Sequence, residues 1–151
     1  MLSLIYPPFV KGRGAVGLLI LRLVVGAAFI VHGWPKIQNP FGWMEGKSVF
    51  PPTPGILQAC SAVAEFGGGI ALILGLLTPL AALGIFGSMS GAMMMVHIPN
   101  HHPFVAGGRD PSYEVVVVYM AVMLLLILIG PGMLSVDACL FGRKRGAAIA
   151  T

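Results

Sequence analysis

Charged side chains are scarce in this sequence. Of its 151 residues, 9% are charged and 57% are hydrophobic, and the mean hydropathy is +0.92. A soluble domain is about a quarter charged, so this chain cannot coat the surface of a globule of its size with charge. A disordered chain is also excluded, because disorder requires low hydrophobicity and high charge. We therefore expect a membrane protein in contact with the lipid bilayer, built as a single domain over residues 1–151.

The motifs of well-known soluble enzymes are also missing. The sequence contains no G-x-S-x-G, no Walker loop, no Rossmann glycine pattern after a strand and no H-E-x-x-H. The net charge of +4 does not predict a nucleic-acid partner, because no stretch interleaves basic and aromatic residues.

Four apolar segments are present, at residues 14–33, 56–77, 79–98 and 113–130. Each is about 18 to 22 residues long, enough to cross a hydrocarbon core of about 30 Å as a helix. The segments do not alternate as barrel strands do, and backbone in lipid must satisfy its own hydrogen bonds. We predict an all-α membrane protein, a four-transmembrane-helix bundle.

Two local patterns refine this bundle. Thr78-Pro79 joins the second and third segments, which predicts a tight helical hairpin with Thr78 as the N-cap and Pro79 in the first turn. Glycines at 67–69 in the second segment, and the Gly87/Gly91 spacing in the third, predict close approach of helix backbones.

With four spans, both termini lie on the same side of the membrane. Five basic residues fall on that side and three on the other: Lys11, Arg13, Arg143, Lys144 and Arg145 against Lys36, Lys47 and Arg109. The positive-inside rule then predicts cytoplasmic termini in a bacterial or archaeal inner membrane. This topology separates Cys60 from Cys139, so no intramolecular disulfide is expected.

Two charged residues fall deep inside the spans. Arg22 and Glu65 lie at depths of about 12 and 18 Å from the inner ends of their segments. Either charge alone in hydrocarbon is costly, which predicts that the two form an ion pair. The pair either fixes the helix register or forms the polar floor of a cofactor-binding cavity beside a quinone.

Ionisable residues also gather at the outer boundary. His32 and His97 end the first and third segments, and Glu114 begins the fourth. These three are the candidate catalytic residues, since imidazole and carboxylate can exchange protons with a quinone. Trp34, beside His32, is a further candidate cofactor-binding residue.

Imidazoles at this level are also candidate ligands for a metal ion or haem iron, namely His32, His97, His101 and His102. The alternative is that they are simple interfacial residues.

The stretch from Leu21 to Lys36, with its Leu-Arg, Gly, Phe, His-Gly and Lys landmarks, resembles the opening helix of DoxX family membrane proteins. Glu65-Phe66-Gly67-Gly68 and Gly75-Leu76-Leu77-Thr78-Pro79 are similar to the second helix and hairpin of that family. Glu114, Gly130-Pro131-Gly132, Ser135 and Asp137 resemble its last helix and exit. The resemblance covers residues 14–140, and its polar landmark positions are Arg22, His32, Lys36, Glu65 and Glu114.

The resemblance implies a four-helix membrane protein. Some members of the family are small membrane subunits of thiosulfate:quinone oxidoreductase, and others assemble with redox enzymes at the bacterial membrane. We therefore predict an integral membrane subunit of an oxidoreductase complex that passes electrons toward the quinone pool. Its partners are expected to be other membrane or periplasmic redox subunits, in an oligomer or hetero-complex. The alternatives are a non-catalytic anchor or assembly subunit, and a small haem- or metal-binding protein that uses His32 and His97.

Overall fold

A computed structural model describes residues 8–46, 53–108 and 110–148, with side chains placed as far as residue 142. Every regular element in these ranges is helical: α2 (Arg13–Gln38), α3 (Gly55–Leu74), α4 (Thr78–Ala92), the π-helix η1 (Met93–His97), α5 (Glu114–Ile129) and α6 (Val136–Ala148). The all-α class is confirmed for the described residues.

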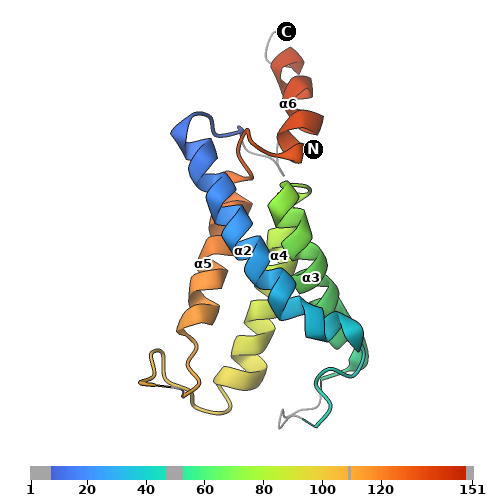
Figure 1. The fold of residues 1–151 in the computed structure, drawn as a ribbon, viewed down its shortest axis with the longest axis vertical. Helices are drawn as coiled ribbons and strands as arrows, with labels where there is room; N and C mark the ends of the chain where they lie inside the picture. Colours follow the sequence, from blue (N-terminus) through green and yellow to red (C-terminus); the bar gives the residue numbers. More distant parts are fainter. Residues whose placement is uncertain (1–7, 47–52, 109, 149–151) are drawn as a thin grey trace.

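Within the described part of the chain, three helices are long and apolar enough to cross a membrane, namely Arg13–Gln38, Gly55–Leu74 and Thr78–His97. α5 is apolar but shorter, so four such spans are not established. The turn between α3 and α4 lies at the same end of the molecule as α6 (Figure 1). The described residues that directly follow α2, 39–46, and the end of η1 lie at the opposite end. Many large apolar side chains are exposed, among them Val31 and Leu128, as expected for a surface that faces lipid.

The first predicted segment ends too early. α2 does not stop at Gly33 but continues through Pro35 to Gln38. This extra length places Lys36 on the helix, whereas the sequence pattern had assigned it to the following connection. α3 ends at Leu74, a little before the predicted end, where Gly75 takes the left-handed conformation at φ 66°.

The α3–α4 hairpin is present, but Thr78 is not its N-cap. Leu77 holds that position with φ 47°, and the Thr78 hydroxyl has no hydrogen-bond partner among the described residues. The cap comes from far along the chain, since the Asp137 carboxylate accepts hydrogen bonds from Leu77 N at 2.7 Å and Thr78 N at 2.9 Å. Asp137 belongs to α6, a helix that the hydropathy pattern did not predict. Pro79 is in the first turn, as predicted.

Close packing occurs between α2 and α3. A Cβ atom on Gly26 would lie 2.7 Å from Gly69 O, and one on Gly33 would lie 2.5 Å from Phe66 N. The prediction for the 67–69 cluster is thus confirmed at Gly69. It is wrong for Gly87 and Gly91, where an added Cβ would meet nothing within 4 Å.

Arg22 does not pair with Glu65, and that prediction is wrong. Arg22 is fully buried; its Nη1 donates to Leu72 O at 3.2 Å and its Nη2 donates to Leu134 O. The reason is helix register. Because α2 and α3 meet at Gly26/Gly69 and Gly33/Phe66, Arg22 comes level with Leu72, whereas Glu65 comes level with the last turns of α2.

Candidate functional site

A cavity of about 910 Å³ lies along α3 and α4. Small residues of both helices line it: Gly84, Gly87 and Gly91 on α4, and Ser61 and Ala64 on α3. Its apolar wall includes Leu57, Met95 and Val96. The cavity extends from the middle of α3 to the end of η1, where His97, Asn100 and His102 contribute to its lining.

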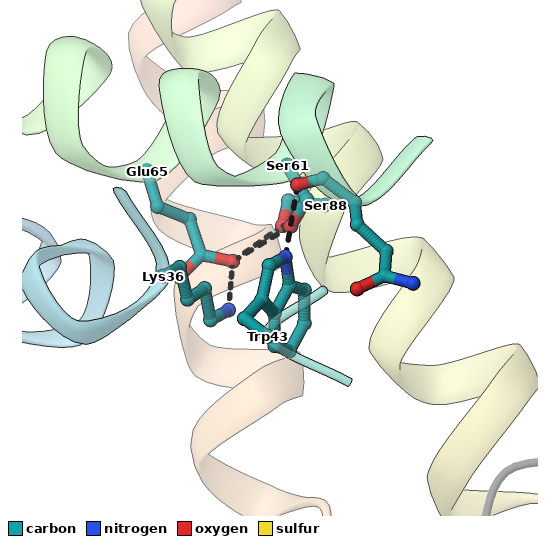
Figure 2. Close-up of polar contacts among 6 residues, drawn as sticks. Lys36, Trp43, Ser61, Glu65 and Ser88 are labelled. Atoms are coloured by element: carbon teal, nitrogen blue, oxygen red, sulfur yellow. Dashed lines mark hydrogen bonds and ion pairs between the residues drawn. The ribbon is translucent and has the colours of Figure 1, made fainter. Parts of the chain in front are cut away.

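Lys36 and Glu65 form an ion pair in the wall of this cavity. Lys36 Nζ lies 2.5 Å from Glu65 Oε1, and the Glu65 side chain is 1% exposed whereas that of Lys36 is 21% exposed. Ser61 Oγ and Ser88 Oγ also donate to Oε1, at 3.2 and 2.5 Å. Figure 2 shows these side chains converging on Glu65 from α2, α3 and α4. A buried carboxylate with three donors is far less costly than a lone one.

The second carboxylate oxygen of Glu65 is different. Oε2 is buried and has no hydrogen-bond partner among the described residues. An unsatisfied oxygen of this kind is expensive to bury, by about 1–3 kcal/mol or more for a charged group. Binding of a proton at this oxygen, or a hydrogen bond donated to it by a water or a ligand, would remove that cost.

Trp43 covers the ion pair from the connection after α2. Lys36 Nζ lies 4.4 Å from the centroid of the Trp43 ring, a cation–π arrangement. Trp43 Nε1 donates to Gln58 O at 2.9 Å. The Gln58 side chain in turn accepts from Met44 N and donates to Thr53 O, each at 2.9 Å. These bonds fasten the connection to the start of α3 and fix one end of the cavity.

Three residues were predicted to be catalytic, and of these His97 lines this cavity whereas His32 and Glu114 do not. Its Nδ1 lies 3.1 Å from Nδ1 of His102, and its ring lies beside Tyr113. His32 is exposed and contacts Tyr119, with ring centroids 6.3 Å apart. Tyr119 is six residues beyond Tyr113, or about 9 Å further along α5, so the contacts place the two histidines at different levels.

The remaining predicted site residues lie elsewhere. Trp34 is exposed and packs against Phe66, with ring centroids 5.7 Å apart, and Glu114 is exposed at the start of α5. His101 lines a second cavity of about 450 Å³. Arg22 lies at the opposite end of the bundle.

Among the described residues, no group of three His, Cys, Asp or Glu side chains could hold a metal ion. Cys60 and Cys139 are both free, as expected.

Sequence reasoning missed four members of the site: Lys36, Trp43, Ser61 and Ser88. One local signal was available, because Ser61 precedes Glu65 by four residues and therefore shares a helix face with it. Lys36 was visible as a landmark but not as the partner of Glu65, because α2 was expected to end at Gly33, three residues before Lys36. Ser88 and Trp43 come from other segments, and only the tertiary fold brings them to Glu65.

Comparison with known proteins gives matches along most of the chain. Residues 17–98 match the DoxX family. The chain is 31% identical to "Inner membrane protein YqjF" of Escherichia coli, over 83% of this chain and 92% of that protein. It is 31% identical to "Inner membrane protein YphA" of the same species, over 80% and 87%. It is 29% identical to "Putative oxidoreductase CatD" of Bacillus subtilis, over 87% and 92%. No solved structure matches.

Proposed function

Because the chain belongs to the DoxX family of membrane proteins, we propose that it is the membrane subunit of an oxidoreductase complex and binds a quinone in the cavity between α3 and α4. The name of the Bacillus subtilis relative supports the redox assignment. The observation that carries the proposal is the Lys36–Glu65 pair in the wall of an otherwise largely apolar cavity. Ionisable groups buried in a membrane are functional candidates by default.

The residues of the cavity fit a quinone. The volume of about 910 Å³ lies within the range of about 300–1,000 Å³ that is usual for ligand pockets. Leu57, Met95 and Val96 offer an apolar wall for a ring and the start of a lipid tail. The Lys36 ammonium, which uses one of its three donors on Glu65, can donate to a quinone carbonyl oxygen, and Glu65 Oε2, which lacks a partner, can accept from a quinol hydroxyl.

A quinone supplies a two-electron acceptor that also takes up two protons when it becomes a quinol. The two electrons come from a redox subunit outside this chain. Glu65 can hold one proton at Oε2, and Lys36 can donate a hydrogen bond from its ammonium group. Lys36 is partly exposed near the end of α2, and the proposal requires that both protons reach the pair from water at that end. Proton exchange by His32, His97 and Glu114 stays a prediction.

Replacing Glu65 with glutamine tests the proposal. The variant keeps the shape of the side chain but removes its charge and its proton. We expect the affinity for a short-chain quinone to fall about 10- to 100-fold, because the Lys36 ammonium loses the carboxylate that holds it beside the cavity, and a hydrogen bond from a charged group contributes about 1.5–3 kcal/mol. Binding is measured by quenching of Trp43 fluorescence in a Trp34→Phe background, where Trp43 is the single tryptophan of the chain.

Glu45→Gln is the matched control, since Glu45 is an exposed carboxylate in the connection after α2. It should bind quinone as the parent does, and melting temperatures of all variants report whether they are folded. Equal quenching in the Glu65→Gln variant and the parent, or no saturable quenching in the parent, contradicts the proposal. Such a result favours the non-catalytic anchor or assembly role.

We further propose that α5 is a fourth span and that both termini are cytoplasmic. The chain enters α2 and leaves α5 at the same end, where Met133 N donates to Val10 O at 2.9 Å. Lys11 and Arg13 lie at that end, as do the backbone positions of the basic residues in α6. The excess of basic residues on this side favours a cytoplasmic location for it. The end of the cavity that His97, Asn100 and His102 line then lies toward the outer face.

A labelling experiment decides the orientation. Single cysteines at Lys11 and Asn39, both exposed, are introduced into a chain in which Cys60 and Cys139 are replaced by serine. In intact cells a membrane-impermeant thiol reagent should label the Asn39→Cys protein, whereas the Lys11→Cys protein should react only after the cells are permeabilised. The opposite pattern would place the end of the cavity that His97, Asn100 and His102 line on the cytoplasmic side.

A further inference from the structure

The end of the third candidate span has an unusual backbone. Residues Met93–His97 form a π-helix, and the wide turn continues, since Ile98 N donates to Met93 O at 3.0 Å and His102 N donates to His97 O at 3.1 Å. Both bonds join residues five apart. His101 has φ 51°, a left-handed conformation that is uncommon for a residue other than glycine. Short π-helices and strained residues of this kind cluster at functional sites.

This backbone brings two imidazoles together. Nδ1 of His97 and Nδ1 of His102 are 3.1 Å apart, and the ring planes are inclined by 74°. A tetrahedral metal ion with bonds of about 2.0–2.1 Å places its ligand nitrogens roughly 3.3 Å apart. The observed separation is therefore close to the edge of a coordination polyhedron. Two neutral rings with their protons on Nε2 would both present a lone pair to the same ion.

We propose that His97 and His102 bind a copper ion. The pair lies where the 910 Å³ cavity and the second, 450 Å³ cavity meet, because both histidines line both. Met93 lines the second cavity, together with His101 and Tyr113. Imidazole combined with a thioether favours copper over magnesium or calcium, which prefer oxygen ligands. The protein supplies two nitrogen ligands, and the other positions are open to the Met93 sulfur, to water or to an added ligand.

This site does not depend on the quinone proposal, because it rests on the turn and the histidine pair and not on Glu65. His32 is not part of it: its ring lies with Phe29 and Tyr119. The sequence suggested four candidate histidine ligands. The proposed site uses two of them, His97 at the end of η1 and His102 in the wide turn that follows.

The test uses the full-length protein in detergent after removal of any polyhistidine tag. Titration with copper(II) sulfate should reach one ion per chain, and the electron paramagnetic resonance spectrum should show coupling to nitrogen. His97→Gln and His102→Gln should each weaken binding by at least about 100-fold, because loss of an outer-shell partner alone already costs 10- to 100-fold. His32→Gln removes an imidazole outside the pair and should bind copper as the parent does.

A second measurement needs no variant. Copper should protect His97 and His102 of the parent protein from modification by diethyl pyrocarbonate, read by mass spectrometry, while His32 stays reactive. Binding that survives in the His97→Gln/His102→Gln double variant overturns the proposal. So does a parent that takes up no stoichiometric copper, which would leave the two rings as a hydrogen-bonded pair only.

Discussion

Arg22→Leu is expected to destabilise the protein by about 3–5 kcal/mol, enough to abolish most of the folded yield in detergent. Arg22 is 0% exposed, and its guanidinium joins the end of α3, through Leu72 O, to the segment after α5, through Leu134 O. Leucine fills part of the same volume but donates no hydrogen bond. Both carbonyl groups would lose their Arg22 donor in a place that water does not reach easily.

The same region holds the C-terminal helix on the bundle. Asp137 accepts from the N–H groups of Leu77, the N-cap of α4, and of Thr78, its first residue. Its own N–H donates to Gly75 O at 2.9 Å. A Cβ atom on Gly75 would come within 2.0 Å of Arg22 Nη1, which shows how tightly the guanidinium is enclosed. Loss of Arg22 should therefore also loosen α6. Thermal unfolding followed by circular dichroism measures the first effect, and limited proteolysis after residue 130 measures the second.

Arg13→Leu is the matched control for this experiment. Arg13 begins the same helix but is exposed, so its replacement should change stability by no more than about 0.5 kcal/mol. A double variant adds a sharper test. Because Arg22 and Glu65 do not touch, the effects of Arg22→Leu and Glu65→Leu should be additive within about 0.3–0.5 kcal/mol. A double variant milder than either single variant would restore the pairing that depth alone suggested.

The sequence predicted the helices because hydropathy is a local property. Three predicted segments coincide within a few residues with long apolar helices, and the fourth coincides with α5. The assignment to membrane proteins followed from the low fraction of charged residues, and the polar landmark positions already suggested the family. Thr78 shows the limit of local rules, since a good capping residue was displaced by a carboxylate 59 residues away.

Side-chain pairing could not be predicted in the same way. Depth in the membrane placed Arg22 and Glu65 near each other, but depth says nothing about which faces meet or where two helices cross. The crossing is set by Gly26, Gly33 and Gly69, whose partners are visible only when the chain is folded. One further turn of α2 then supplied Lys36 as the partner of Glu65. The cavity was invisible because an empty space leaves no pattern in a sequence.

Gly87→Leu is expected to abolish quinone binding while leaving the fold intact. A Cβ atom at Gly87 meets nothing within 4 Å, and the residue lines the cavity on α4, so a leucine side chain would occupy space that a ligand needs. Leucine is also among the better helix formers, whereas glycine is among the worst. The melting temperature should therefore stay the same or rise, while the affinity for a short-chain quinone falls at least about 10-fold.

Gly33→Leu makes the same substitution where the helices touch. Its Cβ would lie 2.5 Å from Phe66 N and 2.7 Å from Phe66 Cα, so α2 and α3 would have to separate, at a cost of about 3 kcal/mol or more. Opposite outcomes for these two glycines, with Gly33→Leu losing folded protein and Gly87→Leu losing ligand, would separate packing from binding in a single experiment. Undiminished Trp43 quenching by quinone in folded Gly87→Leu protein would mean that the ligand lies outside this cavity, and Lys36–Glu65 would then be a structural ion pair.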